Sequence, residues 1–189
     1  NMLSYNELKK GTLFVWNGEP YEVLEYNFVR MQQRRPSAQT KIRNLKTGSI
    51  SMQTFKQSDS FEELEFEKKP AVFVFCSRGI CTFHMAGKPS ERFTVSEEEK
   101  LQGKSAYLKP NTEVTARYID DELLDIELPV KVDLKVKDAP PAVRGNTAQG
   151  SLKQVTLETG LTINVPMFIS EGDTLRINTE SGAYVERVK

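Results

Sequence analysis

The 189-residue sequence contains one histidine and two cysteines. Neither the single His84 nor the spacing of Cys76 and Cys81 provides the ligand pattern of a zinc site. Glycine-rich phosphate loops, nucleophile elbows and metalloprotease motifs are also missing. We therefore expect no enzymatic activity, no metal and no cofactor, and we interpret His84 as a partly buried structural residue.

Long apolar segments are lacking as well. No run approaches the roughly 18 apolar residues of a membrane-spanning helix, and the first residues contain no signal-peptide core. We expect a cytoplasmic protein that does not bind membranes. In that setting Cys76 and Cys81 are expected to be free thiols, although the turn-like sequence between them makes a disulfide sterically conceivable.

Acidic residues are absent from 26–58, although the whole chain has a formal net charge of +0. The same stretch holds seven cations, which are Arg30, Arg34, Arg35, Lys41, Arg43, Lys46 and Lys56. Such a local asymmetry is typical of a surface that binds a polyanion. The alternative is a solvated loop whose charges only increase solubility. The lack of nearby carboxylates favours phosphate as the partner.

Short strands and tight turns dominate the sequence. The strand patterns of 21–29 and 39–45 predict a β-hairpin with a long polar tip, and Asn17-Gly18 predicts a tight hairpin turn before it. One short helix is expected near 96–102, because Ser96 and Glu99 have the spacing of a capping box. The pattern predicts an all-β protein of three consecutive small β-barrels, with domains at 1–65, 66–128 and 129–189.

The third module resembles a known family. Residues 153–172 closely resemble the C-terminal signature of bacterial elongation factor P, with Val155 where the family usually has alanine. The chain end at 181–189 and the segments 6–11, 17–20 and 41–48 are also similar to that family, so the resemblance covers the whole chain. It implies a KOW-type, SH3-like barrel followed by two OB-fold-like barrels in an L-shaped molecule.

The resemblance also implies a function. The family binds the 70S ribosome between the peptidyl and exit tRNA sites and promotes peptide-bond formation on ribosomes stalled at consecutive prolines. The implied partners are rRNA, peptidyl-tRNA and the mRNA at the exit site, and we expect a monomer. The alternative is a free-standing OB-fold RNA-binding protein that stacks bases on Phe73, Phe75 and Phe83. The alternation of these phenylalanines fits a barrel core better.

In that family the tip of the first-module hairpin reaches the peptidyl-transferase centre. Its apex is usually a modified lysine, or in some branches a glycosylated arginine. Counting without a gap places the apex at Gln33, whose amide cannot be lysylated because it is not a nucleophilic amine. We expect an unmodified tip, the alternative being a bent loop with Arg34 at the apex. The tip residues are Met31, Gln32, Gln33, Arg34, Arg35 and Pro36.

Further RNA contacts are expected outside the tip. Three cations of the same hairpin are candidates to bind tRNA or rRNA, namely Arg30, Lys41 and Arg43. The family's Gly-Asp-Thr loop, which reads the exit-site codon, corresponds here to Arg144, Gly145, Asn146 and Thr147. Asparagine in place of aspartate keeps an acceptor, adds a donor and removes a charge; the alternative is a simple turn. Near the chain end, Tyr184 and Arg187 are expected to contact RNA.

Overall fold

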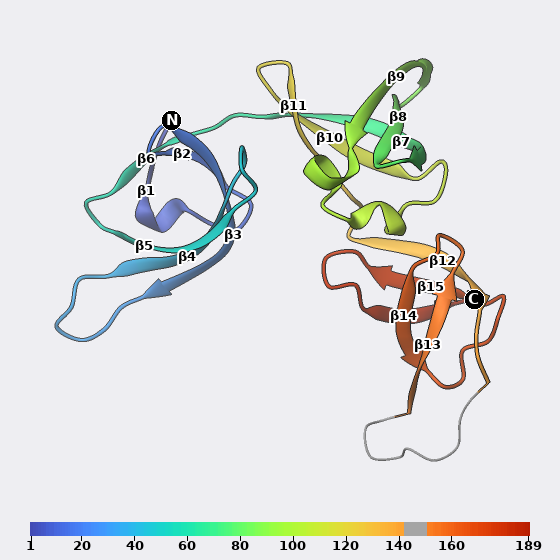
Figure 1. Ribbon diagram of the computed structural model, residues 1–189. Coiled ribbons are helices and arrows are strands. Elements are labelled where there is room, and N and C mark those ends of the chain that lie inside the picture. The colour runs from blue at the N-terminus through green and yellow to red at the C-terminus, as the bar shows by residue number, and fades with distance from the viewer. Residues whose placement is uncertain (142–150) are drawn as a thin grey trace. The chain divides into compact units, whose positions relative to one another are not determined.

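The computed structural model describes residues 1–141 and 151–189 (Figure 1). These residues form three antiparallel sheets with three short helices, and they divide into two compact units, 1–67 and 68–189. The prediction of an all-β chain with three small β-modules is confirmed. The domain boundaries expected from the sequence stay a prediction. Among the described residues, no helix is long and apolar enough to cross a membrane.

The first unit is built around an aromatic core. Its sheet has the order β1-β6-β2-β3-β4-β5, so β1 and β5 lie at its two ends. The strands are β1 (Met2–Ser4), β2 (Leu13–Trp16), β3 (Glu19–Val29), β4 (Ser37–Asn44), β5 (Ile50–Lys56) and β6 (Ser60–Glu63), and η1 (Tyr5–Glu7) is a 3-10 helix. Phe14 is fully buried, and its ring centroid lies 5.3 Å from that of Phe61 and 5.9 Å from that of Tyr21. Asn17 and Gly18 both have positive φ, as the predicted tight turn requires.

The predicted helix directly follows an edge strand of the second sheet. Its order is β11-β10-β7-β8-β9, and helix η2 follows β9 with the Ser96 hydroxyl accepting a 3.3 Å bond from the Glu99 N–H. The capping prediction is therefore confirmed on the Ser96 side. The elements are β7 (Glu67–Ser77), β8 (Ile80–Met85), β9 (Lys88–Ser96), η2 (Glu97–Leu101), η3 (Lys104–Tyr107), β10 (Glu113–Ile119) and β11 (Glu122–Glu127).

Two expectations about β7 are wrong. Cys76 and Cys81 form a disulfide because the register of β7 and β8 places them directly opposite each other, with Cα atoms 4.0 Å apart. Phe73 and Phe83 are buried as expected, but Phe75 is 49% exposed. The register shifts between Phe73 and Phe75, and this irregularity turns the second phenylalanine away from the core.

A buried ion pair in this sheet was not predicted. Arg117 on β10 lies opposite Asp125 on β11, and two hydrogen bonds of 2.7 and 2.5 Å join the guanidinium to the carboxylate. The Arg117 residue is only 7% exposed. A register shift directly after Arg117 accompanies its inward position. His84, as expected, is half-buried, and its Nδ1 lies 2.9 Å from the Met85 carbonyl oxygen.

The third sheet has the order β14-β13-β12-β15-β16. Its strands are β12 (Lys131–Asp138), β13 (Leu152–Leu157), β14 (Thr162–Pro166), β15 (Thr174–Asn178) and β16 (Tyr184–Val188). As the alternating pattern predicts, Val132, Leu134 and Val136 are buried. Across the outer face, Arg176 donates to Asp133 at 2.9 Å and to Glu186 at 2.8 Å, which ties three neighbouring strands together.

The second and third sheets share a seam inside the unit 68–189. The Thr159 hydroxyl donates a 2.5 Å hydrogen bond to the Ala106 carbonyl, and Tyr107 packs against the core of the third sheet. The Thr179 hydroxyl donates to the Pro129 carbonyl at 2.5 Å, which fixes the short connection between the sheets. The third module is therefore held by packing and hydrogen bonds rather than by a slack tether.

We expect Gly182→Ala to weaken this seam. Gly182 has φ +74°, and an added Cβ would lie 2.8 Å from the Tyr107 hydroxyl. A non-glycine residue in the left-handed backbone conformation lowers stability by about 1–2 kcal/mol, and the clash with the Tyr107 hydroxyl adds to this loss. Urea unfolding followed by circular dichroism should therefore show a larger loss of unfolding free energy for Gly182→Ala than for Gly172→Ala. That control has φ +90° but nothing within 4 Å of its added Cβ. Equal losses of stability in the two variants would contradict the clash. So would a Gly182→Ala variant whose stability does not recover when Tyr107→Phe removes the hydroxyl.

Candidate nucleic-acid interface

The candidate interface is a hairpin arm of the first unit. β2 pairs with β3 only from Glu19 to Glu22, whereas β3 and β4 stay paired as far as Val29 and Ser37. The two strands therefore continue beyond their pairing with β2 as a long hairpin (Figure 1). β5 supports β4 along the same length, as its Lys56 lies opposite Ser37. The predicted tipped hairpin is confirmed.

A tight turn closes the end of the arm. The Arg34 N–H donates a 3.2 Å hydrogen bond to the Met31 carbonyl, which makes Gln32 and Gln33 the central residues of a β-turn. Gln33 has φ +66°, and a positive φ at the third turn position alone is typical of a type II turn. The apex expected from gapless counting therefore falls within this turn, and Arg34 closes the turn as its fourth residue.

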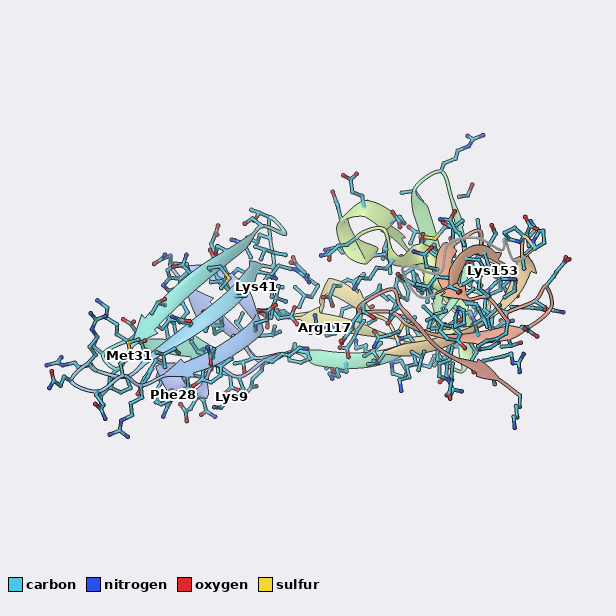
Figure 2. The ribbon with its side chains drawn as sticks, turned by 90° about the horizontal axis from the view of Figure 1, so that it is seen from below. Lys9, Phe28, Met31, Lys41, Arg117 and Lys153 are labelled. Atoms are coloured by element: carbon cyan, nitrogen blue, oxygen red, sulfur yellow. A yellow bond between two sulfur atoms is a disulfide. The ribbon has the colours of Figure 1, made fainter. Side chains whose placement is uncertain are left out.

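The arginines of the tip are exposed and unpaired. Within the part of the chain that the structure describes, Arg30, Arg34 and Arg35 have no hydrogen-bond or ion-pair partner for their guanidinium groups. Figure 2 places Met31 near the end of the arm, with Phe28 and Lys9 nearer its base. Guanidinium groups that lack a protein acceptor are suited to paired contacts with phosphate oxygens.

Lys41 differs from the other cations of the stretch. Its Nζ lies 3.3 Å from an oxygen of Glu25, because the two residues are directly opposite in the pairing of β3 and β4. Glu25 precedes the acid-free stretch by one residue, so a reading along the sequence does not connect the two charges. Lys41 is therefore partly neutralised, whereas Arg43 is half-buried and has no ion-pair partner within the described part of the chain.

Aromatic side chains near the N-terminus brace the arm. The rings of Tyr5 and Phe28 have centroids 6.2 Å apart, and the Tyr26 hydroxyl donates a 3.3 Å hydrogen bond to the Asn6 carbonyl. The Lys9 ammonium lies 4.3 Å from the centroid of the Tyr26 ring, which adds a cation–π contact. Sequence reasoning missed this brace, although an aromatic residue at position 28 in a polar arm is a signal for it.

The helix η1 that carries this brace has its own anchor. Glu7 accepts a 2.7 Å hydrogen bond from the Ser4 N–H and a 3.0 Å bond from the Ser4 hydroxyl. Both hydrogen bonds lower the pKa of Glu7, and the bond from the Ser4 backbone has the larger effect. The lowered pKa means that this anchor contributes stability above the ordinary glutamate pKa, and that the contribution disappears as the pH falls through the folded value.

The remaining predicted site residues have other surroundings. Tyr184 is half-buried and packs against the core of the third sheet. Arg187 lies 3.8 Å from Asp173 and 5.3 Å above the ring of Phe168, so it has partners within its own module. The predicted codon-reading loop, Arg144, Gly145, Asn146 and Thr147, lies outside the described residues. No cluster of His, Cys, Asp and Glu suited to a metal occurs in 1–141 or 151–189.

We expect Gln33→Gly to stabilise the first unit by about 1 kcal/mol, because glycine adopts a positive φ without the steric cost of a Cβ. Unfolding followed by Trp16 fluorescence measures the change. Gln32→Gly is the matched control, since position 32 has no positive φ, and it should be neutral or destabilising. A stability loss in Gln33→Gly would show that the left-handed conformation is not maintained in solution.

Two models of one protein family match the ends of this sequence. Residues 4–61 match the elongation factor P KOW-like domain, and residues 132–187 match the elongation factor P C-terminal domain. A solved structure described as eukaryotic translation initiation factor 5A from Methanococcus jannaschii is 13% identical, with a TM-score of 0.46 over 68% of this chain and 94% of that chain.

Curated relatives match over the full length. Elongation factor P of Thermodesulfovibrio yellowstonii is 39% identical over 188 residues, which cover 100% of both chains. Elongation factor P of Natranaerobius thermophilus is 34% identical, and the match covers 100% of this chain and 99% of that protein. With these identities along the whole length, the chain belongs to the elongation factor P family.

Proposed function

We propose that this translation elongation factor binds the ribosome beside peptidyl-tRNA and promotes peptide-bond formation where consecutive prolines stall it. The observation that carries the proposal is the arm, which ends in the exposed, unpaired Arg30, Arg34 and Arg35. The membership of the family supports a role in translation. The charge on the arm supports an RNA partner, because the chain as a whole is neutral.

The tip contains two kinds of RNA-binding residue, one that acts through charge and one that acts through hydrogen bonds. The arginines bind phosphates, and these contacts position the arm without reading a sequence. Gln33 offers an amide with two donors and an acceptor, suited to the sugar and phosphate groups at the tRNA 3′ end. The brace of Tyr5 and Tyr26 at the base of the arm limits its bending, so that the amide is presented at a defined position.

The other parts of the proposal concern the second unit. Arg144, Gly145, Asn146 and Thr147 would read the mRNA at the exit site through hydrogen bonds from Asn146 and Thr147. Tyr184 and Arg187 would contact RNA with the surface that their intramolecular partners leave open, and the factor would act as a monomer. The rival proposal of a free-standing RNA-binding module loses two of its three stacking platforms, because Phe73 and Phe83 are buried.

Translation of a polyproline template tests the proposal. Protein made in a host without tip-modifying enzymes is expected to relieve the stall fully, because Gln33 cannot be lysylated. A template without prolines serves as the control. Gln33→Ala combined with Arg34→Ala should abolish the relief without changing translation of the control template. A stall that persists until native-host extract is added, with a mass increase on Arg34 or Arg35, would overturn the unmodified tip.

A further inference from the structure

The disulfide on β7 and β8 joins two unlike surroundings. Cys81 is fully buried in the core of the second sheet, together with Phe83 and Val95, whereas Cys76 is exposed. An attacking thiolate therefore reaches the Cys76 sulfur from solvent, while the surrounding core shields the Cys81 sulfur. The pair consequently has one accessible sulfur and one protected sulfur.

The strand pairing does not depend on this bond. On one side of the pair, Phe73 lies opposite Phe83 and Ala71 opposite Met85; on the other, Ser77 lies opposite Ile80. The turn is also tied to the start of η2 by a 2.9 Å hydrogen bond from the Glu97 N–H to the Gly79 carbonyl. These contacts keep Cys76 and Cys81 facing each other in the reduced state, so the bond can open and re-form within an intact sheet.

The bond is also poorly placed to stabilise the fold. The two cysteines have a sequence separation of 5, and a disulfide that closes so short a loop removes less entropy from the unfolded chain than one that closes a long loop. In the reducing compartments where translation proceeds, disulfides are usually transient or redox-sensing rather than structural. This last step rests on the proposed function; the geometric steps do not.

We propose that Cys76 and Cys81 form a reversible thiol–disulfide site that exchanges with low-molecular-weight thiols through Cys76. A thiolate attacks the Cys76 sulfur and forms a mixed disulfide, while Cys81 leaves with the electron pair and takes up a proton. A second small-thiol molecule then attacks the small-thiol sulfur of the mixed disulfide, and Cys76 leaves with the electron pair and takes up a proton. The protein disulfide is thereby reduced by two electrons and two protons to two thiols, and two small thiols are oxidised to one disulfide. Oxidation follows the same steps in reverse.

Glutathione buffers of graded reduced-to-oxidised ratio test the site in the full chain. Aliquots are quenched with acid, denatured, alkylated with N-ethylmaleimide after return to neutral pH, and their intact mass is measured, because the buried Cys81 reacts only once the protein is unfolded. We expect a reversible transition between an unalkylated and a doubly alkylated species, reached equally from the oxidised and the reduced side. The far-UV circular dichroism should stay unchanged across the transition, because the strand pairing holds both states.

Two variants test the asymmetry. Cys81→Ala keeps the exposed cysteine and should accumulate a mixed disulfide with oxidised glutathione, since no partner thiol can expel the glutathione. Cys76→Ser keeps the buried cysteine and should react at least about tenfold more slowly with the same reagent, because burial blocks access. Circular dichroism of both variants confirms that the sheet is intact.

Several outcomes would overturn the proposal. One is wild-type protein that is doubly alkylated in every buffer, which would show that the bond does not form. Another is protein that stays unalkylated after every buffer, which would show that the bond is permanent. Equal reaction rates of the two single-cysteine variants would refute entry through Cys76. None of these measurements involves ribosomes, so failure here leaves the proposed role in translation untouched.

Discussion

Replacing Arg30, Arg34 and Arg35 with alanine is expected to weaken ribosome binding about 100-fold at 0.1 M salt. Each phosphate contact contributes about 0.7–0.9 to the magnitude of the slope of log affinity against log salt, so three lost contacts should lower that magnitude by about 2–3 units. These side chains are exposed and have no partner in the described residues. Their removal should therefore leave the fold unchanged. Sedimentation with 70S ribosomes at graded salt concentrations measures both quantities.

Lys41→Ala provides the matched control for this experiment. It removes one cation from the same arm, but Lys41 is already partly neutralised by Glu25 at 3.3 Å. We expect a change in slope smaller than that of any single tip arginine. If the triple variant keeps the affinity and the salt slope of the wild type, the tip is a solvated loop and the arm does not bind phosphate.

Phe14→Ala is expected to lower the free energy of unfolding of the first unit by about 3–5 kcal/mol, the usual loss for a fully buried phenylalanine. Phe14 is 0% exposed, and its ring contacts those of Phe61, Tyr21 and Phe55. The truncation leaves a cavity between these rings, which cannot all move to fill it. Because the arm is built from strands of the same sheet, its function should fail at a correspondingly lower temperature.

The only tryptophan of the chain makes this measurement specific. Trp16 belongs to the first unit, where its ring lies 5.4 Å from Tyr21 and 5.6 Å from Phe55. Its fluorescence therefore follows the unfolding of 1–67. Leu175→Ala, which truncates a fully buried side chain of the third sheet, should shift this fluorescence transition much less. If the free energy of unfolding of Phe14→Ala lay within about 1 kcal/mol of the wild-type value, the aromatic cluster would not be the main source of stability of the first unit.

The features predicted correctly from the sequence are those that depend on neighbouring residues. The Asn17-Gly18 turn, the helix start at Ser96 and the hairpin between 21 and 45 each have local signals in backbone preference or capping. The polar turn at the end of this hairpin was predicted for the same reason, because its residues are consecutive. The alternation of Val132, Leu134 and Val136 likewise indicated which side of β12 is buried.

The features that were missed depend on strand register. The Cys76–Cys81 bond and the Glu25–Lys41 ion pair arise because the partners are directly opposite in paired strands. The exposed Phe75 results from a register shift. One displaced residue reverses the face of every side chain beyond it, and the alternation of hydrophobic residues gives no warning of such a shift.

The place of β5 at the end of the first sheet affects how the protein behaves when it is concentrated. Within the described chain β5 is paired through β4 alone, so its other edge can accept a strand from a second copy. The segment 50–55 is uncharged, and it exposes Ile50 and Met52, a composition typical of segments that start fibrils. Lys46 and Lys56 flank this segment, and their charges repel an identical segment at the edge. The acid-free stretch therefore also protects the factor against self-association.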